Sequence, residues 1–125
     1  MPVIRRNRMV KKRLAAQRSP CPVASALDII GDRWTLLIVR DLFYGRTRFK
    51  DFAASAEGIP TNILSDRLER LLKRRIVEQI PAADGTKRLA YRLTEKGKAL
   101  GPVLKAMRDW GLAWDKSTRV LISRV

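Results

Sequence analysis

The sequence has no histidine and a single cysteine, Cys21. These absences exclude Ser-His-Asp and Cys-His catalytic sites, His-ligated metal sites and any disulfide within the chain. Long apolar runs are also missing, since the longest, Leu36 to Val39, is far too short to span a bilayer. The 12 carboxylates are scattered, and no glycine-rich phosphate loop follows a predicted strand. We therefore expect no enzyme, metal, cofactor or membrane partner.

Acidic residues are few beside the basic ones. Against 12 Asp and Glu there are 27 Lys and Arg, which gives a net charge of +15 and an isoelectric point near 11.2. Seven of the basic residues precede residue 20, and the others still outnumber the acidic residues. A field of this sign attracts polyanions, and nucleic acid is the leading candidate partner.

The length of 125 residues predicts one folded domain that needs no disulfide to hold it together. Residues 1–20 are predicted to form a basic, disordered arm, residues 21–119 the domain and residues 120–125 a tail. An Arg-rich transit peptide is the alternative interpretation of the arm. A lone thiol is typical of a reducing compartment, so we expect a cytoplasmic protein.

Apolar residues at helical spacing predict two helices at the start of the domain. Cys21-Pro22 fits a helix start, because proline is preorganised for the first helical position, and Gly31 is expected to end that helix. Asp32 is expected to cap a second helix that ends at Gly45. This second helix is apolar on most of its circumference, which predicts a buried central position.

A pair of helices with a short connection is predicted next. Phe49 to Ala56 form a brief helix, which Gly58-Ile59-Pro60 interrupts. Thr61 is expected to act as the N-cap of a longer helix with four leucines on its core side. This layout is typical of a helix-turn-helix. The four leucines are Leu64, Leu68, Leu71 and Leu72.

A hairpin and a final helix complete the predicted fold. Val77 to Ile80 and Leu89 to Leu93 alternate like strands, and Asp84-Gly85 between them predicts a tight turn. Thr94 is expected to cap the last helix, which Pro102 should kink or divide. The sequence thus predicts a mainly α fold with a small β-hairpin wing: a winged helix-turn-helix.

The longer helix of the pair presents polar and basic side chains opposite its leucines. Asn and Arg have the geometry to read adenine and guanine edges in the major groove. Further basic residues lie before the helix pair and beside the hairpin tip. The alternative is a solvated helix face, stabilised by an i,i+4 pair of Asp66 and Arg70. The predicted DNA-binding residues are Arg46, Arg48, Thr61, Asn62, Ser65, Asp66, Arg67, Arg70, Arg74, Lys87 and Arg88.

Several short motifs are distributed through the predicted domain. They include Cys21-Pro22-Val23, Gly31-Asp32-Arg33-Trp34-Thr35-Leu36-Leu37-Ile38, Leu93-Thr94-Glu95-Lys96-Gly97 and Trp110-Gly111. Together these motifs resemble the HxlR-type winged helix-turn-helix transcriptional regulators. The resemblance covers about residues 21–115 and implies a bacterial, homodimeric DNA-binding protein. Arg75 departs from the family, which usually has glycine there to end the helix in a left-handed conformation.

The last helix carries more apolar surface than a domain this small can cover. Burial against a second copy, together with the first helix, is the simplest solution, and the resemblance points the same way. A ligand-stacking box of tryptophans is the alternative. The predicted dimer-interface residues are Val23, Leu27, Leu104, Met107, Trp110 and Trp114.

Cys21 allows two interpretations. It is either a small packed residue beside a helix start or a regulatory thiol. The positive end of the helix and the nearby Arg18 favour the thiolate. The resemblance implies that a cysteine near this position senses oxidants or electrophiles in several family members.

The sequence therefore predicts a homodimeric transcriptional regulator on a pseudo-palindromic DNA operator, with an oxidant or small molecule as candidate effector. One alternative is a basic RNA-binding or nucleoid-associated protein that binds by charge alone. Another is an adaptor that has lost DNA binding. Discrimination between operator sequences would separate the first from both.

Overall fold

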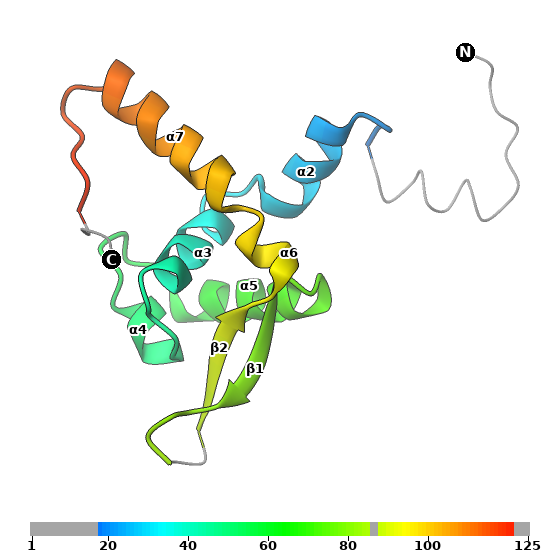
Figure 1. Ribbon diagram of the computed structural model, residues 1–125, viewed down its shortest axis with the longest axis vertical. Coiled ribbons are helices and arrows are strands. Elements are labelled where there is room, and N and C mark those ends of the chain that lie inside the picture. Colours follow the sequence, from blue (N-terminus) through cyan, green and yellow to red (C-terminus); the bar gives the residue numbers. More distant parts are fainter. Residues whose placement is uncertain (1–17, 86–87, 122–125) are drawn as a thin grey trace, which may run out of the picture. The chain divides into compact units, whose positions relative to one another are not determined.

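The computed structural model describes residues 18–85 and 88–121 (Figure 1). The chain divides into two compact units between Arg33 and Trp34. The predicted arm up to residue 17, Lys87 of the predicted hairpin tip and residues 122–125 of the predicted tail lie outside the described residues.

The described part of the first unit contains the helix α2 (Pro22–Ile30). As predicted, Cys21 occupies the N-cap position and Pro22 the first turn. Gly31 ends the helix in a right-handed conformation, with a φ of −83°. Glycine is needed there for another reason, because a Cβ atom would lie 2.3 Å from the carbonyl oxygen of Leu27. Ile30 is the one residue of α2 that is buried.

The helix α3 (Thr35–Phe43) forms the centre of the second unit, as the sequence predicted. Its apolar residues Leu36, Ile38, Val39 and Leu42 are buried. The prediction that Asp32 is the N-cap was wrong, because the carbonyl of Trp34 accepts the first helical bonds, from the amides of residues 37 and 38, each at 3.1 Å. Gly45 follows the helix end with a φ of 91°, which glycine adopts without strain.

The predicted helix pair consists of α4 (Phe49–Ala53) and α5 (Thr61–Lys73). Asp51 fixes the start of α4, since its carboxylate accepts hydrogen bonds from the amides of Thr47 and Arg48 at 3.2 and 3.0 Å. Thr61 is the first residue of α5 and not its N-cap. Pro60 takes the N-cap position, because its extended backbone places its carbonyl 2.9 Å from the amide nitrogen of residue 64.

The two strands β1 (Val77–Pro81) and β2 (Leu89–Leu93) pair antiparallel, with Val77 opposite Leu93 and Pro81 opposite Leu89. Residues 82–88 connect the strands, and the predicted turn at Asp84-Gly85 lies among them, since the amide of Gly85 donates to the carbonyl of Ala82 at 3.3 Å. Ala82 is buried, and its amide donates to the carbonyl of Arg88 at 3.2 Å, which continues the pairing one residue beyond the strand ends. The amide of Tyr91 donates to the carbonyl of Thr47 at 2.8 Å, so the segment before α4 is bound to the hairpin.

The last predicted helix is divided into α6 (Glu95–Lys98) and α7 (Gly101–Trp114). Thr94 caps α6, because its hydroxyl accepts a hydrogen bond from the amide of Gly97 at 3.1 Å. Pro102 lies in the first turn of α7, which explains the division. The α5 helix and the hairpin lie on one side of α3, and α7 leads away on the other (Figure 1).

The carboxyl end of α5 has the geometry of a Schellman motif. The amide of Ile76 donates to the carbonyl of Leu71 and the amide of Arg75 to that of Leu72, both at 3.0 Å. This motif requires a left-handed residue, and Arg75 provides it with a φ of 60°. The chain therefore keeps the helix end that glycine favours but places an arginine in it, at a cost of roughly 1 kcal/mol.

We expect Arg75→Gly to raise the free energy of unfolding by about 0.5–1 kcal/mol, because glycine relieves the left-handed strain while losing more entropy on folding. Urea denaturation measures this change. The control is Arg74→Gly. Arg74 is right-handed with a φ of −83°, so glycine there should lower the free energy of unfolding. Destabilisation in both variants would contradict the prediction.

Candidate nucleic-acid interface

One face of α5 brings together most of the predicted DNA-binding residues. Burial of Leu64, Leu68 and Leu71 against the core leaves the opposite side of the helix exposed. Arg67 lies at the edge of this face, where its side chain is only 17% exposed and donates a hydrogen bond to the carboxylate of Asp66. The exposed predicted residues of α5 and its carboxyl end are Thr61, Asn62, Ser65, Asp66, Arg70 and Arg74.

Arg48 joins the helix pair to the hairpin loop. Its guanidinium donates a hydrogen bond to the carboxylate of Asp84, and its side chain is only 17% exposed. Arg88 lies on the exposed side of the same loop. The hairpin loop and the start of α4 are thus held together by this ion pair.

Arg46 binds the buried carboxylate of Asp41, a residue that the sequence did not identify as functional. Asp41 of α3 is 1% exposed, and its Oδ1 accepts hydrogen bonds from Arg46 Nη1 at 3.3 Å and Arg40 Nη2 at 2.9 Å. Its Oδ2 accepts from the hydroxyl of Ser55 at 2.5 Å. The one signal in the sequence was a lone acidic residue inside the largely apolar central helix.

Arg40 extends this network to the connection between α4 and α5. Its Nη1 and Nη2 donate to the two carboxylate oxygens of Glu57, each at 2.9 Å. The bonds from Arg40 lower the pKa of Glu57, and those from Glu57 raise the pKa of Arg40. The resulting chain of charges connects α3 to the segment that leads into α5.

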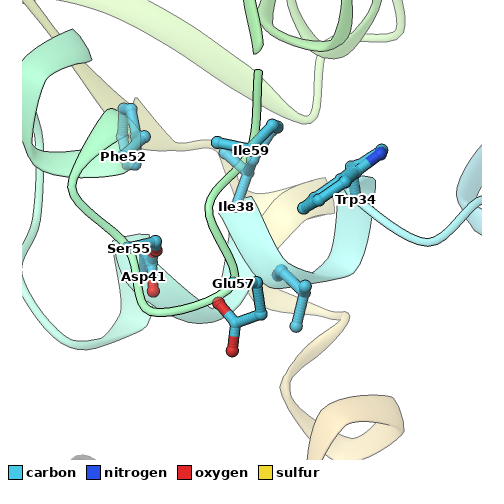
Figure 2. A pocket seen from close by; sticks show the side chains of 8 residues that line it. Trp34, Ile38, Asp41, Phe52, Ser55, Glu57 and Ile59 are labelled. Atoms are coloured by element: carbon cyan, nitrogen blue, oxygen red, sulfur yellow. The ribbon is translucent and has the colours of Figure 1, made fainter. Parts of the chain in front are cut away.

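A small hollow beside this network is lined by Trp34, Ile38, Phe52 and Ile59, with Asp41 and Ser55 close together at one side (Figure 2). Its volume of about 10 Å³ holds at most one water molecule, so it is not a ligand pocket. Trp34 therefore belongs to this packed region. The other two tryptophans of the predicted stacking box lie on α7.

The α7 helix has no buried residue along its length. Trp110 is 69% and Trp114 76% exposed, and Met107 is exposed beside them, whereas Leu104 is half-buried. On α2 the predicted interface residues Val23 and Leu27 are also exposed. The predicted dimer-interface residues thus form apolar surfaces on the two helices.

Cys21 is exposed, which argues against the interpretation as a packed residue. Its amide donates to the hydroxyl of Ser19 at 3.2 Å, and its carbonyl accepts from the amide of Ser25 at 2.9 Å. The guanidinium of Arg18 does not bind the thiol. Its Nε donates to Asp28 Oδ1 at 2.6 Å, so the carboxylate balances the charge that was expected to favour the thiolate.

Within the described ranges, the acidic and sulfur-containing side chains form no group of three that could bind a metal ion. In the same ranges, no helix is long and apolar enough to cross a bilayer.

The sequence profile of the HxlR-like helix-turn-helix proteins matches residues 29–119. The chain belongs to the HxlR family. The crystal structure of PA1607 resembles this HxlR chain with a TM-score of 0.73 and 44% identity, covering 86% of this chain and 73% of PA1607. This likeness and the family match confirm the winged helix-turn-helix fold predicted from the sequence.

Two curated relatives are named as HTH-type transcriptional regulators. MT3179 of Mycobacterium tuberculosis is 39% identical over 71% of this chain and 56% of its own length, so the HxlR chain spans just over half of that relative. YodB of Bacillus subtilis is 36% identical over 72% of this chain and 81% of YodB. The structure of reduced YodB has a TM-score of 0.64 and 32% identity, covering 81% of this chain and all of YodB. Transcription regulation is therefore the function of the family.

We expect the wild-type HxlR chain to be more stable than Glu57→Gln at neutral pH, and the difference to shrink as the pH falls. Arg40 lowers the pKa of Glu57 below its ordinary value of 4.5. The stability from this pair is therefore complete above the unfolded-state pKa and is lost as the pH falls through the lower folded-state value. Urea denaturation between about pH 7 and about pH 3 measures the difference.

The control for this measurement is Glu69→Gln. Glu69 forms an exposed i,i+4 pair with Lys73 at 3.6 Å, and such pairs contribute little to stability. A Glu57→Gln difference that stays constant over the whole pH range would contradict the assignment of the Arg40 pair.

Proposed function

We propose that this chain is a sequence-specific transcriptional regulator that binds double-stranded DNA as a homodimer. The α5 helix enters the major groove, and the hairpin loop lies against neighbouring phosphates. The observation that carries this proposal is the exposed face of α5, which combines Asn62 and Ser65 near the start of the helix with Arg70 and Arg74 further along. Such side chains read base edges and neutralise phosphates.

The basic surplus of the chain supports the same partner. A net charge of +15 attracts DNA over long distances and gives every duplex some affinity. Charge alone would not distinguish sequences, so specificity depends on the side chains of α5. A regulator of this kind acts where bacterial DNA lies, in the cytoplasm.

The exposed apolar residues of α7 support the homodimer. Met107, Trp110 and Trp114 are exposed on one helix, and soluble monomers rarely leave such large side chains together in water. A second copy of the chain covers them most simply, with α2 as the second contact. Two copies related by a twofold axis would present two α5 helices to successive major grooves.

The test is a selection of tightly bound sequences from duplexes of random sequence, with the full chain as bait. We expect an inverted repeat, because a twofold dimer reads the same half-site twice. Arg70→Ala should weaken binding to the selected duplex by about 1–3 kcal/mol if Arg70 contacts a base, without loss of fold. Fluorescence anisotropy measures the affinity and circular dichroism the fold.

The matched control is Arg108→Ala, which removes one exposed positive charge from α7. It should weaken binding to all duplexes only slightly. Selection of no common sequence, with affinity set by salt alone, would favour the non-specific basic protein. Absence of any DNA binding would favour the adaptor.

We propose, as the effector response, that oxidants or electrophiles act through Cys21. Cys21 is exposed, and the related YodB has been solved in reduced, quinone-bound and diamide-treated forms. The chain has no second cysteine, so a disulfide must join two copies or a small thiol. Diamide should release wild-type protein from the selected duplex but not Cys21→Ser, as measured by anisotropy. Equal retention of DNA by both would exclude this response.

A further inference from the structure

A carboxylate lies at the centre of the exposed face of α5. With 3.6 residues per turn, Asn62, Asp66 and Lys73 fall opposite the side that the buried leucines occupy. The side chain of Asp66 is 54% exposed. A negative charge at the middle of a surface that meets DNA lowers the affinity for every duplex, because it faces phosphates of the same sign.

The contacts of Asp66 leave one of its oxygens available. Arg67 Nη1 donates a hydrogen bond to Oδ2, and Arg70 Nη1 forms an ion pair with the same oxygen at 3.8 Å. In the part of the chain that the structure describes, Oδ1 of Asp66 accepts no hydrogen bond. Two guanidinium groups thus balance the charge, while Oδ1 keeps its capacity to accept.

The chemistry of the major groove decides what this oxygen can bind. Phosphates offer no donor, and the donors on base edges are the N4 amino group of cytosine and the N6 amino group of adenine. Adenine carries the acceptor N7 beside N6 on the same base, which repels a carboxylate, whereas cytosine itself presents no acceptor beside N4 in the major groove. A carboxylate on this face is therefore matched to cytosine.

We propose that Asp66 is a specificity-determining residue, whose Oδ1 accepts a hydrogen bond from N4 of a cytosine in each half-site. This inference rests on the proposed function, in which α5 enters the major groove. Arg67 and Arg70 hold the carboxylate in place and reduce its repulsion from the phosphates. The same carboxylate opposes thymine, which presents the acceptor O4 where cytosine presents the donor N4.

The experiment combines substitutions of C·G base pairs in the half-site with substitutions of Asp66. Each C·G pair of the half-site selected by the wild-type chain is replaced in turn by T·A in a synthetic duplex. At one position the wild type should prefer cytosine to thymine by about tenfold. Asp66→Asn should bind both duplexes equally within about twofold, because an amide both donates and accepts. Asp66→Ala should lose the preference as well.

The matched control is Glu69→Gln, which removes the other exposed carboxylate of α5. Glu69 lies one turn further along and pairs with Lys73 at 3.6 Å. This variant should keep the wild-type preference for cytosine, although its affinity for all duplexes rises slightly. Thermal melting by circular dichroism verifies that the variants keep their fold.

The outcomes separate this inference from the function on which it rests. If the wild type selects a sequence and Asp66→Asn keeps the same preference for cytosine, the role of Asp66 is overturned and the proposed function stands. A uniform change of affinity for all duplexes in the Asp66 variants also overturns it. If the wild type selects no common sequence, the proposed function itself fails.

Discussion

The buried carboxylate of Asp41 is the interaction on which the second unit depends. A carboxylate that is 1% exposed costs several kcal/mol unless nearby groups donate hydrogen bonds to it. Its donors come from three segments: Arg40 from α3, Arg46 from the segment before α4, and Ser55 from the connection that leads to α5. These donors can meet at one carboxylate only if the helix pair packs against α3. Arg40 then extends the constraint to Glu57, close to the first turn of α5.

The carboxyl end of α5 is fixed by hydrogen bonds from the segment that begins α6. The hydroxyl of Thr94 donates to the carbonyl of Arg75 at 2.6 Å, and Lys96 Nζ donates to the carbonyl of Arg74 at 2.7 Å. A Cβ atom at Gly97 would lie 2.2 Å from the carbonyl oxygen of Ile76, so only glycine permits this approach. Since α6 begins here and leads into α7, these bonds connect the end of α5 to the segment that leads into α7. The helix proposed for DNA binding and the helix proposed for dimerisation are thus joined by a short, hydrogen-bonded segment.

The sequence predicted the helices and strands better than it predicted the contacts between distant side chains. The cap at Thr94 and the division at Pro102 depend on neighbouring residues alone, and both were confirmed. Thr61 was wrongly predicted as a cap, because the choice between adjacent residues depends on where the preceding turn directs its carbonyl. The pair of Arg48 and Asp84 joins residues 36 positions apart, and no periodicity in the sequence indicates such a contact. The same holds for the partners of the buried carboxylate in α3.

The few acidic residues act mainly within the fold, and this explains how a chain so basic is held together. Asp28, Asp41, Glu57, Glu78 and Asp84 each form an ion pair with an arginine of the described part. Most of these pairs connect different segments, so the carboxylates link parts of the fold, while the surplus of lysine and arginine remains for an external polyanion. Asp66 differs from them, because its arginine partners lie on its own helix and hold it on the outward face. Packing does not require Asp66 on this face, and its charge would lower the affinity of the proposed interface for DNA, so discrimination between base pairs is the role that we propose for it.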